Sequence, residues 1–245
     1  FSAYVVGGAV LDLLLGRNPK DFDVATNATP EEIKQHFRTA RIVGKRFKIV
    51  HIRSGREVVE VTTFRRDQRL NAPNKFHRAT KSGRLLRDNV FGTLQQDARR
   101  RDLTINALYC DPVNGGAIID ELDGIDDVHN KIIRVIGNPE ERYREDPVRM
   151  LRAVRFAAYL NFNLEFETKI AISKARHLLR DIPPARLFDE WIKLFMAGCS
   201  LKTFRLLIHY DLLVPLMGEA ICYASEDTDP QNQQINALSN TDQRI

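Results

Sequence analysis

Two aspartates separated by one phenylalanine, Asp21 and Asp23, have the spacing in this chain that most directly suggests chemistry. In an extended segment, residues i and i+2 point to the same face, so the two carboxylates either repel each other or share divalent cations. Cations held in this way position a nucleoside triphosphate for in-line attack by a hydroxyl group. Polar and apolar residues also alternate on any half-exposed strand, so the pair alone leaves both interpretations open.

A glycine pair, Gly7 and Gly8, precedes the aspartates in the segment VVGGAVLDLLLG. The apolar residues before the glycines predict a buried strand, and AVLDLLLG predicts a helix that ends at Gly16. Glycines at the start of a helix leave backbone N–H groups accessible to phosphate oxygens, although Gly-Gly also occurs in ordinary turns. A glycine turn followed by an aspartate pair favours a site for a nucleotide.

Hydrophobic periodicity predicts the elements that position these residues. DFDVAT predicts a short strand, and NATPEEIKQHF predicts a helix with Thr29 as its cap and Pro30 at its first position. RFKIVHI and EVVEVTTF predict a hairpin joined at RSGR, with Glu60 on a strand able to pair beside the aspartates. LQQDARRRDLTINALY has helical character. Residues 65–84 are polar and basic, which predicts a loop that either binds RNA or is simply disordered.

The periodicity changes near residue 136. Short strands are predicted before this point, in GAIIDEL and KIIRVIG, and apolar residues recur at helical spacing almost throughout the segment that follows. We therefore predict an α+β chain with a mixed α/β domain over residues 1–136 and an all-helical domain over residues 137–245.

Composition limits the classes of partner and site. The net charge of +5 and the local clusters of arginine suit a polyanion. No apolar run approaches the roughly 20 residues of a membrane-spanning helix, which predicts a soluble chain without a membrane partner. Cys110, Cys199 and Cys222 are widely separated, which suits neither a disulfide framework nor a zinc site and indicates a reducing cytoplasm. The six histidines lack metal-ligand spacing, so we expect structural or surface roles for them.

Four motifs occur in a fixed order: VVGGAVLDLLLG, KDFDVATNATPEE, RRDLTINAL and EDPVRMLRAVRF. Together they resemble the class II nucleotidyltransferases, the family of bacterial poly(A) polymerases and CCA-adding enzymes. LLRDNVFGT, IGNPEERYREDPVRMLRAVRFAA and DIPPARLF are similar to the gammaproteobacterial poly(A) polymerase branch. The resemblance implies a polymerase-β-like palm domain with a mixed sheet, followed by a helical neck and body. It also implies template-independent addition of AMP from ATP to RNA 3′ ends, a step of mRNA processing in the bacterial cytoplasm.

The resemblance also implies roles for residues of the first domain. Asp21 and Asp23 would bind two Mg²⁺ ions, and a third carboxylate would complete the site. Glu60 and Asp102 are alternatives for that place, and Asp102 of the RRD motif also suits a helix N-cap ahead of LTINAL. Arg101 of the same motif is placed near the sugar or triphosphate, because its fork of donors suits phosphate oxygens.

The motif EDPVRMLRAVRF predicts a helix with Asp146 at its cap and Pro147 at its first position. At about 100° per residue, its apolar residues form one face and its polar residues form a ridge, with Arg155 at the edge of the apolar stripe. By resemblance, Asp146 and Arg149 contact the incoming base without a template, and Arg152 and Arg155 contact the triphosphate.

The sequence departs from the family pattern at one position. After the double glycine the family usually has G-G-x-V-R-D, whereas this chain has GGAVLD, with Leu11 in place of the arginine. We expect weaker triphosphate binding than in a Leu11→Arg variant, unless Arg17 or Lys20 supplies the charge. A CCA-adding enzyme and a catalytically weak RNA-binding protein remain the alternative functions. Family members carry a further C-terminal region that helps to bind RNA, so we expect this chain to be truncated there.

Overall fold

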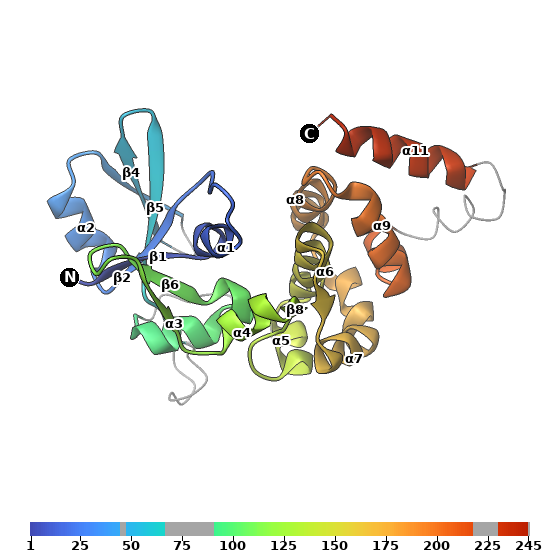
Figure 1. Cartoon of the computed structure of the whole chain (residues 1–245), viewed down its shortest axis with the longest axis horizontal. Helices are drawn as coiled ribbons and strands as arrows, with labels where there is room; N and C mark the ends of the chain where they lie inside the picture. Colours follow the sequence, from blue (N-terminus) through green and yellow to red (C-terminus); the bar gives the residue numbers. More distant parts are fainter. Residues whose placement is uncertain (45–47, 67–90, 218–229, 245) are drawn as a thin grey trace. The chain divides into compact units, whose positions relative to one another are not determined.

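The computed structural model describes residues 1–44, 48–66, 91–217 and 230–244 (Figure 1). The chain forms two compact units, Phe1–His129 and Asn130–Ile245. The first unit thus ends before the boundary predicted near residue 136. The physical reason is that β8 (Ile132–Ile133) pairs in parallel with β9 (Asn163–Leu164), so this strand packs with the helices of the second unit.

A seven-stranded mixed sheet forms the centre of the first unit, with the strand order β3-β4-β5-β2-β1-β6-β7. β2 and β5 pair in parallel, and the other neighbouring strands are antiparallel. The strands are β1 (Ala3–Val6), β2 (Asp23–Thr26), β3 (Ala40–Val43), β4 (Ile49–Ser54), β5 (Glu57–Thr63), β6 (Leu108–Asp111) and β7 (Ala117–Asp120). The predicted hairpin is confirmed as β4 and β5, and β5 lies beside β2 as the sequence predicted. Most of the predicted basic loop at residues 65–84 lies outside the described residues.

Four short helices accompany this sheet: α1 (Gly8–Leu14), α2 (Pro30–His36), α3 (Leu94–Arg100) and α4 (Gly124–His129). The predicted start of α2 is confirmed, because the Thr29 hydroxyl accepts a hydrogen bond from the N–H of Glu32, and the Glu32 carboxylate accepts one from the N–H of Thr29. α2 packs on the sheet through Ile33, which joins Val50 and Val61 in a buried apolar cluster.

Helical character was predicted for the whole of LQQDARRRDLTINALY, and this prediction was wrong beyond α3. Arg101 has extended backbone angles and ends α3, a short 3-10 turn follows at Thr104–Asn106, and the chain then enters β6. Leu108 and Tyr109 are fully buried on this strand, which pairs with β1 and β7. Pairing in the sheet therefore overrides the helical spacing of the apolar residues.

The second unit is built around α6 (Val148–Leu160). This helix packs against the β8–β9 pair and against α5 (Pro139–Glu145), α8 (Pro184–Phe195) and α9 (Ser200–His209). Its predicted apolar face is confirmed, because Val148, Leu151, Val154 and Ala158 are all buried. The other helices are α7 (Phe166–Ala175), the 3-10 helix η3 (Arg176–Asp181), α10 (Leu213–Met217) and α11 (Pro230–Asp242). Within the described ranges, no helix is both long enough and apolar enough to cross a membrane.

Candidate active site

Asp23 is the first residue of β2 and lies between two strands. Its register partners are Val6 on β1 and Glu60 on β5. Side chains at paired positions of neighbouring strands project from the same face of a sheet, so Asp23 and Glu60 lie side by side. Asp21 was predicted on the same strand, and this was wrong: β1 ends at Val6, opposite Asp23, and the chain then turns at Gly7, so the β1–β2 ladder does not extend to Asp21.

The pKa of the Asp23 carboxyl group is raised above its ordinary value of 3.8. Desolvation of the carboxyl group by the surrounding protein is the largest cause, although part of the residue remains exposed to solvent. The negative charge of Glu60 raises the pKa further. The positive charge of Arg101 lowers it, and the charge of Asp21 raises it. The carboxylates of Glu60 and Asp21 and the guanidinium group of Arg101 thus act on the Asp23 carboxyl group at the start of β2, in the centre of the sheet.

Glu60 also has a partner on its other side. Its Oε1 lies 3.3 Å from Nε2 of His51, the residue opposite it on β4. The Glu60 side chain is 49% exposed, so its carboxylate remains accessible to solvent. An imidazole beside this carboxylate had no signal in the sequence, because the cross-strand register that joins His51 to Glu60 depends on the hairpin turn.

Arg101 is fixed on several sides. Its Nε donates to the Tyr109 hydroxyl at 3.1 Å, its Nη2 donates to Oδ2 of Asp97 at 3.1 Å, and its Nη1 donates to the carbonyl of Asn106 at 3.3 Å. A Cβ atom at Gly7 would lie 4.0 Å from Nη1 of Arg101 and 4.0 Å from Oδ2 of Asp23. Arg101 and Asp23 therefore reach the same glycine turn.

Gly7 forms the turn between β1 and α1, and Gly8 is the first residue of α1. Gly7 has φ 73°, a left-handed conformation that strains other residues, so glycine is required here by the backbone rather than by space. A Cβ atom at Gly8 would meet none of the described atoms within 4 Å. There is therefore space beside Gly8 at the start of α1, and phosphate binding at this turn stays a prediction.

Asp102 is buried, with 7% of its surface exposed, in the segment between α3 and the 3-10 turn. The predicted N-cap role for Asp102 is wrong, because Leu103 is the N-cap of that turn and no side chain caps it. Of the two candidates for a third carboxylate, Glu60 is the one that sits beside Asp23 in the sheet register.

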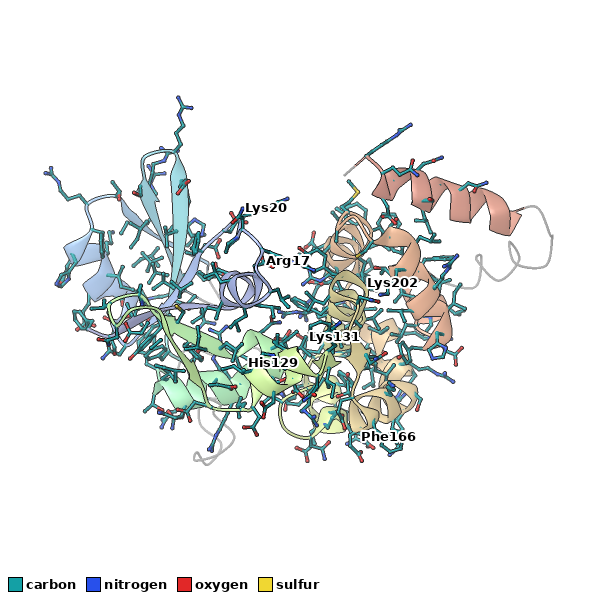
Figure 2. The ribbon with its side chains drawn as sticks, viewed as in Figure 1. Arg17, Lys20, His129, Lys131, Phe166 and Lys202 are labelled. Carbon is teal, nitrogen blue, oxygen red and sulfur yellow. The ribbon has the colours of Figure 1, made fainter. Side chains whose placement is uncertain are left out.

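Leu11, at the position where the family usually has arginine, is 2% exposed on α1. Figure 2 shows Arg17 and Lys20 on the segment that joins α1 to β2. Both residues are exposed.

Divalent cations suit the acidic group of the first unit. Among the described residues, no three His, Cys, Asp or Glu side chains form a ready-made metal cluster. Mg²⁺ is commonly held by one or two carboxylates together with water and substrate phosphates, so a complete protein cage is not required. Desolvation is the largest cause of the raised pKa of Asp23, and the negative charges of Glu60 and Asp21 add to it, so a cation would neutralise part of this effect. Carboxylate oxygens are the ligands that Mg²⁺ prefers.

A second polar group lies in the second unit, where α5 meets α6. Asp146 was predicted to cap α6, but it is the C-terminal cap of α5, and Pro147 stands at the N-cap of α6 without a side-chain bond. Oδ2 of Asp146 instead accepts a hydrogen bond of 2.6 Å from Nη2 of Arg186, at the start of α8. Its Oδ1 is buried, and no described residue donates a hydrogen bond to it.

Arg149 reaches back from α6 to α5. Its Nη1 donates to Oε2 of Glu145 at 2.8 Å and to the carbonyl of Arg142 at 3.1 Å. The Arg149 side chain is 17% exposed, so it is more buried than a residue on a solvent-facing ridge of polar side chains. Arg152 and Arg155 follow on the same helix and are half-buried, and their predicted contact with the triphosphate stays a prediction.

Sequence reasoning missed Asp97, Glu145 and Arg186. Two of them had a local signal, because Asp97 precedes Arg101 by four residues and Glu145 precedes Arg149 by four. In both pairs the arginine lies beyond the end of the helix that carries the acid. Arg186 had none, because it is 40 residues from Asp146.

Comparison with known proteins shows the family of this chain. The family model of the Poly A polymerase head domain matches residues 3–134, and that of a probable RNA- and SrmB-binding site of polymerase A matches residues 161–221. Poly(A) polymerase I of Escherichia coli O6:H1 is 48% identical, over 100% of this chain and 53% of the relative. The poly(A) polymerase I of Haemophilus influenzae is 47% identical, over 100% of this chain and 55% of the relative.

CCA-adding enzymes are also similar to this chain. That of Ligilactobacillus salivarius is 43% identical, over 80% of this chain and 46% of the relative. The crystal structure of the Bacillus stearothermophilus CCA-adding enzyme in complex with CTP has a TM-score of 0.76 and 33% identity, over 97% of this chain and 53% of that one. The chain spans about half the length of the curated relatives it matches. It belongs to the class II nucleotidyltransferase family of poly(A) polymerases and CCA-adding enzymes.

Proposed function

We propose that this chain is the catalytic part of a poly(A) polymerase, which transfers AMP from ATP to the 3′-hydroxyl of RNA without a template. The observation that carries the proposal is the group formed by Asp23, Glu60 and Arg101 at the glycine turn. It joins carboxylates for a metal with a guanidinium group for phosphate, which are the two requirements of nucleotidyl transfer.

The reaction forms one P–O bond and breaks another. The 3′-oxygen of the RNA attacks the α-phosphorus of ATP, the bridging oxygen leaves with pyrophosphate, and the proton of the hydroxyl passes to solvent. Asp21, Asp23 and Glu60 would hold two Mg²⁺ ions, whose charge favours the deprotonated 3′-oxygen and the departing pyrophosphate. We favour Glu60 over Asp102 as the third carboxylate, because Glu60 is the register partner of Asp23.

The arginines and the glycine turn bind the nucleotide in this proposal. The fork of Arg101 contacts phosphate oxygens or the ribose, and the backbone at Gly7 and Gly8 receives the triphosphate. By resemblance to the family, Arg152 and Arg155 stay predicted contacts of the triphosphate.

Asp146 and Arg149 read the base. The buried Oδ1 of Asp146 is an acceptor suited to an exocyclic amino group, which adenine carries at N6 and cytosine at N4, whereas uracil has an oxygen at the equivalent place. This supports ATP or CTP over UTP. The choice of ATP rests on the likeness to poly(A) polymerase I over the whole chain.

RNA is the proposed second substrate. The match of residues 161–221 to the family's RNA-binding model and the net charge of +5 support contact with RNA. A cytoplasmic location stays a prediction that rests on the scattered cysteines.

The proposal is tested by incubating the chain with a primer RNA, Mg²⁺ and each nucleoside triphosphate singly. We expect long extensions with ATP and little extension with the other three. Addition of CTP followed by termination after the CCA sequence would instead support a CCA-adding enzyme. Binding of the primer without any extension would support an RNA-binding protein and contradict the proposal.

A further inference from the structure

Asp97 is a buried carboxylate on α3 whose two oxygens have separate partners. Its side chain is only 1% exposed. Oδ1 accepts from the backbone N–H of Arg65 at 3.0 Å and from Nε and Nη2 of Arg100 at 2.9 Å and 2.6 Å. Oδ2 accepts from the Tyr109 hydroxyl at 2.7 Å and from Nη2 and Nε of Arg101 at 3.1 Å and 3.3 Å. One oxygen thus joins α3 to neighbouring backbone, and the other holds Arg101.

Tyr109 completes the support of Arg101. Its hydroxyl donates to Asp97 and accepts from Nε of Arg101, so the three side chains form a closed hydrogen-bonded group. The Arg101 guanidinium carbon also lies 5.1 Å from the centre of the Tyr109 ring. Because Tyr109 is fully buried on β6, this group is anchored to the central sheet.

The orientation that results points one end of Arg101 at the candidate site. Nε and Nη2 are engaged by Asp97 and Tyr109. Nη1 donates to the carbonyl of Asn106 and also approaches the Gly7 turn near Asp23. A free arginine side chain loses much rotational freedom when it binds phosphate, and a guanidinium group already held in place loses less.

We propose that Asp97, through its Oδ2, is a positioning residue that aims Arg101 at the incoming nucleotide. Asp97 acts through Arg101 and does not touch the substrate, because its side chain is enclosed. The inference rests on the proposed function, since it assigns Arg101 to the nucleotide. It extends the proposed function by giving the two carboxylate oxygens of Asp97 different roles. Oδ1 supports the fold, and Oδ2 supports binding of the nucleotide.

The test measures KM for ATP and kcat in the full chain at saturating primer RNA. It compares variants of Asp97 itself and of the partners of its two carboxylate oxygens. Asp97→Asn removes the charge that holds both arginines, and we expect KM to rise about tenfold, with a smaller change in kcat. Tyr109→Phe removes only the hydroxyl on the Oδ2 side, and we expect KM to rise about threefold. It keeps the proposal falsifiable if Asp97→Asn fails to fold.

Arg100→Gln is the matched control. It removes two hydrogen bonds to Oδ1 and leaves the Oδ2 side in place. We expect it to lower the free energy of unfolding while KM stays within about twofold of the unchanged chain. An equal rise of KM in Arg100→Gln and Tyr109→Phe would overturn the proposal, because general loosening of α3 would then explain both.

A double variant shows whether Tyr109 and Asp97 act through Arg101. In an Arg101→Gln background, Tyr109→Phe should cause no further rise in KM. Full additivity of the two changes would contradict the inference. If the unchanged chain does not add AMP to the primer RNA, the proposed function fails, and calorimetric Kd values for ATP replace KM. Equal Kd values in the unchanged chain, Tyr109→Phe and Asp97→Asn would then overturn the positioning role separately.

Discussion

The two units of this chain hold the arginines that we propose to bind the nucleotide with the same local pairing. In the first unit, the buried carboxylate of Asp97 binds Arg101, four residues further along. In the second unit, the buried carboxylate of Glu145 binds Arg149, also four residues further along. The side chains of the two acids are 1% and 7% exposed. A pair at i and i+4 thus fixes an arginine both beside a mixed sheet and between helices.

The difference between the units lies in what else the acid binds. Asp97 also accepts from Tyr109 on β6, so its arginine is fixed relative to the sheet that carries Asp23. Glu145 also accepts from Arg142 on its own helix, so its arginine is fixed at the junction of α5 and α6, next to Asp146. The first pairing therefore positions an arginine against the proposed metal carboxylates, and the second positions one against the proposed base-reading acid.

The largest expected effect is a loss of catalysis without a loss of base selection. Asp23→Asn removes one carboxylate charge from the group beside Glu60, and we expect AMP incorporation to fall by about a thousandfold or more. Binding of ATP should remain stronger than binding of UTP, because the second unit is unchanged. Quenched-flow measurement of AMP incorporation and calorimetric binding of both nucleotides check these outcomes.

Asp126→Asn is the control for this change, because Asp126 is an exposed aspartate on α4 of the same unit. It should leave AMP incorporation within about twofold of the unchanged chain. Incorporation that persists in Asp23→Asn would refute the assignment of Asp23 to the metal site.

The second prediction removes the acid of the helical unit. Glu145→Gln leaves Arg142 and Arg149 without this carboxylate, and their side chains are only 9% and 17% exposed. Loss of one partner from a buried ion pair costs about 3 kcal/mol, so we expect the free energy of unfolding of the second unit to fall by about that amount. The ratio of kcat/KM for ATP over CTP should also fall, because Arg149 is then less firmly oriented.

The single tryptophan makes this measurement specific. Trp191 lies on α8 of the second unit, so its fluorescence in urea reports the unfolding of that unit. Glu141→Gln is the control, because it changes an exposed glutamate of α5, the helix that also carries Glu145. It should shift the free energy of unfolding by less than about 0.5 kcal/mol. An unchanged ATP-over-CTP ratio in Glu145→Gln would show that Glu145 supports the fold alone.

The third prediction concerns pH and the first unit. Burial is the largest single cause and pushes the pKa of Asp97 upward. The positive charges of Arg100 and Arg101, together with the hydrogen bonds from Tyr109 and from the backbone of Arg65, outweigh it, so the net pKa lies below the ordinary 3.8. The folded state therefore favours the ionised form. The stability that this charge contributes is fully present above 3.8 and is lost as the pH falls through the lower folded pKa.

We therefore expect the advantage of the unchanged chain over Asp97→Asn in free energy of unfolding to shrink in acid, below the ordinary pKa of an aspartate. Urea unfolding followed by circular dichroism at a series of pH values checks this. Trp191 fluorescence serves as the internal comparison, because it reports the second unit. A constant difference between the two proteins at every pH would contradict the ionised, arginine-bound state of Asp97.

The sequence predicted those parts of the site that depend on local pattern. Alternation on EVVEVTTF placed Glu60 on a strand beside Asp23, and the cap at Thr29 followed from residue type and spacing. It did not predict the strand of Tyr109, because the apolar residues of LTINALY also fit a helix and only pairing with β1 and β7 decides between the two. Contacts such as Asp146 with Arg186 join residues 40 apart and leave no periodic signal.

The smallest expected effect comes from an arginine without such a carboxylate anchor. Leu11 is 2% exposed on α1. In Leu11→Arg, the aliphatic part of the arginine side chain would occupy the buried place of the leucine, and its guanidinium group would have to extend to solvent. The positions four residues away are Gly7 and Leu15, neither of which supplies a carboxylate. We therefore expect only about a threefold fall in KM for ATP, less than the effect of releasing the anchored Arg101.

Leu11→Met separates charge from packing at this position. It retains an apolar side chain of similar volume, so KM for ATP should not change and the free energy of unfolding should fall by less than about 1.5 kcal/mol. Leu11→Arg should lower the free energy of unfolding more than Leu11→Met does, because a charge is introduced into a buried place. Equal KM values for ATP in the unchanged chain and in Leu11→Arg would show that Leu11 does not limit binding of the triphosphate. The exposed charges of Arg17 and Lys20 would then account for the tolerance of leucine where the family usually has arginine.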